Sequence, residues 1–329
     1  MIQPPSSFTF KLTEEQIEFL RRLLAESGYD FTDLPYGYYR ARKGKGATGV
    51  GLDAYLSGKL VVSGKGAPEV VEFLIEPEIT GVAKVGYEKV HNPENYDPHI
   101  GIDESGKGDF FGPLVVAAAY TNGDLAEKLL AVGVKDSKQI GSDALALKIA
   151  EQIAEILGPK RFSVLALGPE KYNELYAKFK NLNRFLAWGH ATVLENLLTQ
   201  FPDCPRAISD QFANPAVLRA ALKERGKTIE LVQRTKAESD VAVAAASILA
   251  RAEFLRRMEK LGQAAGESGS LPKGASGHVA AIGRKIFAAQ GSEALARLAK
   301  RHFKTFSEIT GEPPITPPNP FRKFHRPKS

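Results

Sequence analysis

The chain has 329 residues, 43% of them hydrophobic, and a formal net charge of +6. This length exceeds what one compact core usually holds, so two domains are expected, and no apolar run approaches the roughly eighteen residues of a membrane span. A lone cysteine, Cys204, excludes an internal disulfide and a thiolate metal cluster, and the chain starts without a charged-then-apolar leader. These features favour a cytoplasmic protein without a membrane partner.

The positive charge is unevenly distributed along the chain. Residues 1–90 carry 11 Lys and Arg against 12 Asp and Glu, whereas the remaining 239 residues carry 33 against 26. This excess is compatible with a polyanion partner, although a mild excess also occurs on ordinary solvated surfaces. Four of the cations form a C-terminal run that is typical of a disordered end: Arg322, Lys323, Arg326 and Lys328.

The first ninety residues have the pattern of a small α+β domain. A helix is predicted over 13–28, because Thr13 and Gln16 have capping-box spacing and Ile17, Leu20 and Leu24 share a face. Strands are predicted over 36–42, 50–56 and 59–63, with a tight turn at Ser57-Gly58, and an amphipathic helix over 68–75. We assign residues 1–90 to this domain and 91–98, which are polar and proline-containing, to a linker.

The pattern changes after the linker, because strand-like and helix-like segments then alternate. Strands are predicted to end at Asp103 and to span 114–120, 161–167, 206–210 and 228–232, and helices to span 143–157, 184–200 and 239–260. This alternation predicts an α/β domain over residues 99–308, with a mixed sheet flanked by helices. The proline-rich basic tail over 309–329 is expected to be extended or disordered.

Acidic residues follow three of the predicted strands. Asp103, Glu104 and Asp109 come directly after an apolar strand, and an ideal strand would point Asp103 and Glu104 to opposite sides. We therefore expect the chain to bend there, which Gly106 and Gly108 permit. Burying acids at a strand end is costly unless cations bind them.

Two further acids follow later strands of the same domain: Asp210 after the strand 206–210, and Glu238 just before a helix of small residues. Strand ends gather at one edge of an α/β sheet, so the four carboxylates could converge. Four carboxylates suit two Mg²⁺ or Mn²⁺ ions, which prefer oxygen ligands and can stabilise both oxygens of a phosphoryl transfer. Taken singly, an acid such as Asp210 or Glu238 is more often a capping or surface charge.

The segment 101–117, GIDESGKGDFFGPLVVA, resembles the opening motif of type 2 ribonucleases H, and its Ser-Gly-Lys-Gly-Asp form is similar to the ribonuclease HIII branch. Further blocks resemble the same branch in order and spacing: VKDSKQ at 134–139, EKYNELYAKFKNLNRFLAWGHA at 170–191, SDQF at 209–212, TKAESDVAVAAASILAR at 235–251, LPKGAS at 271–276 and AKRHFK at 299–304. The N-terminal stretch GKLVVSGKGAPEVVEFLIEP at 58–77 resembles that branch's extra domain, which is similar in fold to the TATA-box-binding protein.

The resemblance implies a role for each matching residue. It makes Asp103, Glu104, Asp210 and Glu238 the catalytic and metal-binding set, and places Ser105, Gly106, Lys107, Gly108 and Lys138 against the substrate. It also suggests that the N-terminal domain binds the hybrid, with these basic candidates: Arg40, Arg42, Lys43, Lys45, Lys59 and Lys65. His190 is interpreted as a core histidine rather than a catalytic base.

The implied activity is hydrolysis of the RNA strand of RNA/DNA hybrids by a monomer with two metal ions, leaving 5′-phosphate and 3′-hydroxyl ends. Three alternatives remain open. The chain could nick at single ribonucleotides embedded in DNA, as ribonuclease HII does. It could bind hybrids without cutting them, or cut DNA junctions with carboxylates on a similar sheet.

Overall fold

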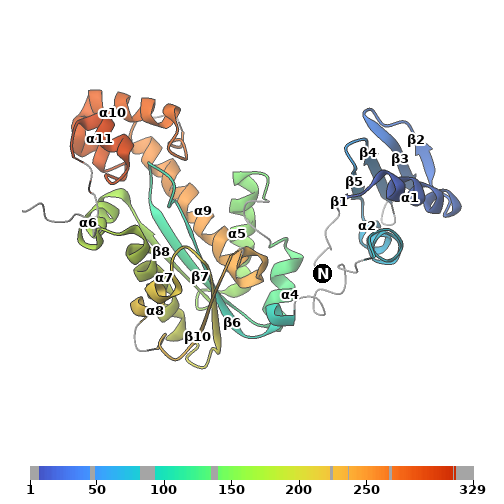
Figure 1. The fold of residues 1–329 in the computed structure, drawn as a ribbon, viewed down its shortest axis with the longest axis horizontal. Helices are drawn as coiled ribbons and strands as arrows, with labels where there is room; N and C mark the ends of the chain where they lie inside the picture. The colour runs from blue at the N-terminus through green and yellow to red at the C-terminus, as the bar shows by residue number, and fades with distance from the viewer. Residues whose placement is uncertain are drawn as a thin grey trace, which may run out of the picture. The chain divides into compact units, whose positions relative to one another are not determined.

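A computed structural model describes residues 7–44, 49–81, 93–134, 140–222, 225–235, 237–266, 269–313 and 315. The chain divides into two compact units, Met1–Tyr96 and Asp97–Ser329 (Figure 1). Each unit has a five-stranded sheet of its own. Among the described residues, none of the helices has the length and hydropathy that a membrane crossing requires.

The sheet of the first unit is antiparallel, with strand order β1-β5-β4-β3-β2. Its strands are β1 (Ser7–Lys11), β2 (Asp30–Thr32), β3 (Gly37–Lys43), β4 (Val50–Tyr55) and β5 (Lys59–Ser63). The predicted turn at Ser57-Gly58 joins β4 to β5, with the Gly58 amide donating to the Tyr55 carbonyl at 2.9 Å. Leu56 was expected to continue the buried alternation of β4, but it lies in the turn and is 61% exposed.

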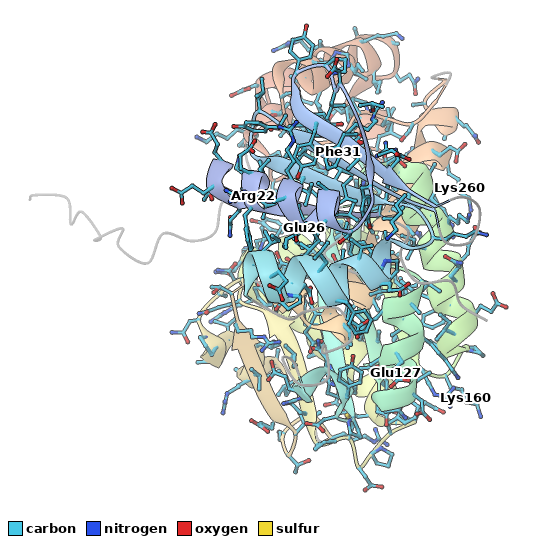
Figure 2. All side chains as sticks on the ribbon, turned by 90° about the vertical axis from the view of Figure 1, so that its right-hand side faces the viewer. Arg22, Glu26, Phe31, Glu127, Lys160 and Lys260 are labelled. Carbon is cyan, nitrogen blue, oxygen red and sulfur yellow. The ribbon has the colours of Figure 1, made fainter. Side chains whose placement is uncertain are left out.

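Helices cover one face of this sheet. The predicted capping box starts α1 (Glu14–Glu26), whose Ile17, Leu20 and Leu24 are fully buried. The second helix runs from α2 (Ala67–Val70) into the π-helical η2 (Val71–Thr80), so it continues past the predicted end at residue 75. Arg22 and Glu26 lie on the exposed side of α1 (Figure 2).

The sheet of the second unit is mixed, with order β10-β9-β6-β7-β8. Its strands are β6 (His99–Ser105), β7 (Leu114–Thr121), β8 (Phe162–Leu167), β9 (Arg206–Asp210) and β10 (Glu230–Arg234). Strands β6, β9 and β10 run parallel, while β7 is antiparallel to β6 and β8. The strand predicted at 228–232 is thus shifted by two residues, and the mixed α/β fold is confirmed.

Helices cover both faces of this sheet (Figure 1). On one face lies α9 (Val241–Ala264), backed by α4 (Gly123–Ala131) and α5 (Asp143–Leu157). On the other lies α7 (Leu182–Leu198), flanked by α6 (Pro169–Phe179) and α8 (Pro215–Ala221). Sequence patterns missed α4, α6 and α8, because each is short or strongly polar and the window patterns were weak.

The face covered by α7 carries an apolar cluster that includes Ile102, Leu114 and Val116 of the sheet. Cys204 lies in this cluster, and burial raises its pKa. The last helices among the described residues are α10 (Gly277–Ala296) and α11 (Lys304–Thr310). Glu312 then hydrogen bonds to Ser292 and Arg301, and Ile315 packs against the apolar cluster, whereas residues 314 and 316–329 lie outside the described residues.

Candidate active site

The four acids singled out from the sequence line one cavity of about 330 Å³ at the carboxyl end of β6 and β9. Asp103 and Glu104 come from β6, Asp210 ends β9, and Glu238 lies in the short helix η5 (Ala237–Ser239) that follows β10. The cavity also includes part of α9 and the loop after β6, through these residues: Ser105, Gly106, Lys107, Gly108, Asp109, Ser247 and Arg251.

Asp103 and Glu104 reach this cavity from opposite faces of the sheet. On the α9 face Gly101 packs so tightly that an added Cβ would lie 2.1 Å from the Val243 nitrogen, and Asp103 is two residues further along that face. On the α7 face Glu104 follows Ile102, a member of the cluster beneath α7. The pairing of β6 with β7 stays in register through Ser105, so the expected bend between the two acids is wrong.

The chain bends only after Ser105. Gly106 has a φ of +88°, and a Cβ there would lie 2.2 Å from the Pro113 carbonyl oxygen, so glycine is required. An added Cβ at Gly108 would meet no described atom within 4 Å, so packing within the protein does not require glycine at that position. The loop that carries Gly106, Lys107 and Gly108 therefore turns back over the strand end and stays open toward the cavity.

His190 on α7 holds Glu104. Its side chain is fully buried, as the interpretation as a core histidine expected, and its Nε2 donates to Oε2 of Glu104 at 3.0 Å. Its Nδ1 lies 3.2 Å from the Oγ of Ser209 on β9. Burial alone would raise the pKa of Glu104, but attraction to His190 and Lys107 keeps that pKa below its ordinary value. The contact with Glu104 was not foreseen, because the sequence does not show which strand α7 covers.

Of the two acids, Asp103 is the one whose ionisation is unfavourable. Burial, and after it the negative charge of Glu104, raise the pKa of Asp103 to about 6. The Ser247 hydroxyl and the Glu104 amide, which donates at 2.8 Å, oppose this effect without cancelling it. The positive charge near Asp103 and Glu104 is therefore too small to keep the pKa of Asp103 at its ordinary value.

The connection from β10 to α9 brings Glu238 close to Asp210, which ends β9. Asp210 pairs in register with Arg234 of β10, and its Oδ1 lies 3.5 Å from the Ala237 amide, one residue before Glu238. Asp240 then caps α9 by accepting from the Ala242 and Val243 amides. The cap fixes where α9 begins, and with it the end of the segment that carries Glu238.

The remaining substrate candidates take different positions. Lys107 is 37% exposed, and its Nζ lies 3.4 Å from Oε1 of Glu104 and 5.6 Å from the centre of the Phe212 ring. Ser105 is half-buried and lines the cavity. Lys138 falls outside the described residues.

The basic candidates of the N-terminal unit are partly neutralised. Arg40 and Arg42 both pair with Asp53, at 3.0 and 2.8 Å, on the sheet face opposite α1. The Nζ of Lys43 donates to the Ser27 carbonyl at 2.7 Å. Lys59 and Lys65 are exposed, and Lys45 falls outside the described residues.

Carboxylates dominate the chemistry of the cavity. Within the described part of the chain, no three His, Cys, Asp or Glu side chains are already assembled closely enough to hold a metal ion. The four acids therefore share a cavity without forming a finished coordination shell, and ligand binding would have to draw them closer.

Comparisons with known proteins agree with this architecture. The family model described as Ribonuclease HII matches residues 100–306. Ribonuclease HIII of Protochlamydia amoebophila (strain UWE25) is 42% identical over 309 residues, covering 94% of this chain and 98% of that protein. Ribonuclease HIII of Chlamydia pneumoniae is 43% identical over 307 residues, covering 93% and 98%.

Solved structures show the same likeness. The crystal structure of Bst-RNase HIII in complex with Mn²⁺ has a TM-score of 0.61 at 31% identity and covers 92% of this chain and 98% of that one. Ribonuclease H2 from Pyrococcus horikoshii OT3 has a TM-score of 0.53 at 25% identity and covers 65% of this chain. With relatives above 40% identity over nearly its whole length, the chain belongs to the type 2 ribonucleases H, a family of endoribonucleases, and within them to the ribonuclease HIII branch.

Proposed function

We propose that this protein hydrolyses the RNA strand of RNA/DNA hybrids with divalent metal ions held by Asp103, Glu104, Asp210 and Glu238. One observation carries the proposal: carboxylates from three separate segments line a single cavity beside the Gly106-Lys107-Gly108 loop. Separate segments converge on one cavity of like charge at a cost in electrostatic repulsion, which a bound cation removes.

The donor set fits a hard cation. All four groups are carboxylates, and Mg²⁺ and Mn²⁺ favour oxygen ligands. The raised pKa of Asp103 supports the same assignment, because two neighbouring buried carboxylates lack the positive charge that would keep both ionised. Bst-RNase HIII, a relative with a solved structure, was crystallised in complex with Mn²⁺.

Each side chain has a distinct part in the reaction. Bound divalent ions would supply the positive charge for attack of water on phosphorus and for departure of the 3′-oxygen, leaving a 5′-phosphate. Asp103 and Asp210, from neighbouring parallel strands, would hold them from the sheet, and Glu238 from the connection to α9. His190 keeps Glu104 oriented and ionised, which fixes its oxygens before substrate arrives.

Recognition of RNA is assigned to the loop after β6. Its backbone is open at Gly108, which permits close approach of a strand, and the partly exposed Lys107 lies at the cavity edge. Amide and ammonium donors there would contact phosphate and the 2′-hydroxyl, the group that separates RNA from DNA. Ser105 lies at the same edge, and Lys138 is assigned to this surface by resemblance alone.

Residues 1–90 are proposed to bind the hybrid through the sheet face that carries Arg40 and Arg42, with 91–98 as the linker and 99–308 as the catalytic domain. The protein is proposed to act as a cytoplasmic monomer. Its single cysteine is buried, which suits a reducing compartment.

A substrate panel tests the proposal. Matched RNA/DNA, DNA/DNA and single-ribonucleotide duplexes are incubated with Mg²⁺ or Mn²⁺, and the cleaved ends are identified. We expect multiple cuts in the RNA strand of the hybrid and none in DNA/DNA. Preferential nicking at the single ribonucleotide would establish the ribonuclease HII-like alternative instead, and tight binding without cleavage would establish a binding protein.

A further inference from the structure

Lys300 lies between α10 and α11, and its side chain has no exposed surface. Within the described residues its ammonium has no carboxylate at ion-pair distance, and burial lowers its pKa to about 7. A methionine would fill similar space without this desolvation cost. A lysine at such a site therefore indicates that its hydrogen bonds serve a purpose beyond filling the core.

Those hydrogen bonds all end on one stretch of backbone. The Nζ of Lys300 donates to the carbonyl oxygens of Asp109 at 2.7 Å and Phe111 at 3.3 Å. The backbone amide of Lys300 donates to the carbonyl oxygen of Phe110 at 2.9 Å. Three consecutive carbonyls thus depend on one residue. The Nζ also lies 5.5 Å from the centre of the Tyr172 ring, which is within the range of a cation–aromatic contact.

The stretch that Lys300 holds is the continuation of the glycine loop. Asp109 follows Gly108 directly, and its carboxylate accepts from the Gly274 amide at 2.6 Å instead of pairing with Lys300. The Gly112 amide donates to the Leu298 carbonyl at 2.9 Å. One end of the Gly106-Lys107-Gly108 loop is therefore fixed by β6 and the other by the segment 298–300.

The support behind this segment is also specific. Asn173 on α6 donates to the carbonyls of Ala296 and Ala299 at 3.0 Å each and accepts from the Arg301 amide at 2.9 Å. The backbone on both sides of Lys300 is thus held in place, so the ammonium projects from a fixed position. Movement of the loop end at Asp109 would break hydrogen bonds that the Lys300 side chain donates in a dry environment, where such bonds are strong.

We propose that Lys300 is a positioning residue for hybrid selection: it fixes the carbonyls of residues 109–111 and so sets the position of the glycine loop at the edge of the acidic cavity. The inference rests on the proposed function, in which that loop contacts the RNA strand. Lys300 itself is buried behind the loop and touches no substrate.

The test compares Lys300→Met with a control that loses stability elsewhere in the same region. Phe306→Leu on α11 removes part of a buried ring at a position that does not line the cavity. For each variant we would measure the KM for a hybrid, the inhibition constant of a competing all-DNA duplex, the melting temperature, and amide exchange over residues 105–114.

For Lys300→Met we expect a KM for the hybrid raised about tenfold, an unchanged inhibition constant for DNA, and faster exchange at residues 110–112. Phe306→Leu should lower the melting temperature and leave the ratio of the two constants as in wild type. A wild-type ratio and wild-type exchange in Lys300→Met would overturn the inference.

If Lys300→Met does not fold, Lys300→Gln, which keeps donors on a shorter stem, is judged by the same ratio and the same exchange. A wild-type protein that does not prefer the hybrid over DNA would defeat the proposed function itself. A wild-type protein that does prefer it, with variants that keep the full preference, would defeat the role of Lys300 alone.

Discussion

The acidic cavity of the second unit and the basic sheet face of the first unit handle charge in opposite ways. At the end of β6, like charges are buried together, and the pKa of Asp103 is raised. On the outer face of the first sheet, Arg40 and Arg42 share Asp53, whose pKa they lower although burial alone would raise it. Buried carboxylates without a counter-ion favour binding of a cation. Arginines that already pair with a carboxylate must break that ion pair before they can bind a phosphate.

This contrast bears on how the two units would contribute to substrate binding. A cation that enters the cavity lowers its electrostatic free energy, because it removes the repulsion between the carboxylates. The contribution of the cavity to catalysis should therefore be large. The arginines exchange one anion, Asp53, for another when they meet a phosphate, so their net contribution should be modest. Four predictions test this difference, from the largest effect to the smallest.

The largest effect is expected for Asp210→Asn. The substitution removes one carboxylate charge with little change of size. If Asp210 binds a catalytic metal, as proposed, the lost contact costs several kcal/mol of transition-state stabilisation. Since each 1.36 kcal/mol is a tenfold change, hybrid cleavage should fall at least about a thousandfold. Hybrid binding, measured by fluorescence anisotropy, should stay within about threefold of wild type.

The matched control is Asp203→Asn, which makes the same change at an exposed position just before β9. It should cleave as wild type does. Cleavage by Asp210→Asn at the rate of the control would remove Asp210 from the catalytic set.

The second prediction concerns titration of two aspartates in metal-free protein. With a folded pKa of about 6, above the ordinary 3.8, Asp103 takes up a proton that the unfolded chain lacks, so its contribution to stability falls as pH rises from 3.8 to 6. Asp53 has a lowered pKa, so its contribution is present above 3.8 and is lost as pH falls through the folded value.

Carboxyl carbon NMR shifts measure both groups in one titration. Added Mg²⁺ should lower the apparent pKa of Asp103, because metal binding releases the proton, and should leave Asp53 unchanged. An Asp103 that titrates near 4 without metal, or that ignores Mg²⁺, would contradict the contrast between the two regions.

The acidic strand end could be predicted from sequence because its signals are local. Acids directly after an apolar strand, and the glycines behind them, indicate both the edge of the sheet and the chemistry. Asp210 and Glu238 were found by their place after later strands, but that pattern alone does not separate them from capping or surface charges, and their roles came from the resemblance. The cavity that gathers the four acids confirms their proximity but does not test their roles.

Other features depend on contacts that local patterns cannot contain. His190 reaches Glu104, and Lys300 reaches Asp109, across separations of 86 and 191 residues. The prediction of a bend after Asp103 was wrong because it assumed that both acids must lie on one face of the sheet. The cavity lies at the strand end and is lined by acids from both faces. Pairing of Arg40 and Arg42 with Asp53 likewise depends on the register of β3 and β4.

The third prediction is a moderate loss of affinity in Arg40→Gln/Arg42→Gln. If both arginines contact phosphates, the hybrid dissociation constant should rise about tenfold. The slope of the logarithm of the association constant against the logarithm of salt concentration should become less negative by about two. The control, Arg21→Gln/Arg22→Gln on α1, removes two cations from the opposite side of the sheet. Equal losses in both variants would show a general effect of charge and no specific face.

The smallest effect is expected for Asp53→Asn, and it separates the two explanations for the basic face. If Asp53 competes with phosphate, its neutralisation frees Arg40 and Arg42, and the hybrid dissociation constant should fall about two- to fivefold at low salt. If Asp53 instead orders the two guanidinium groups for binding, its loss should weaken binding, because both side chains regain rotamer freedom. Asp33→Asn, an exposed change of equal charge in the loop after β2, measures the effect of net charge alone. A change in Asp53→Asn equal to that in this control would show that the arginines do not contact the hybrid, and the N-terminal unit would then have to bind through another surface.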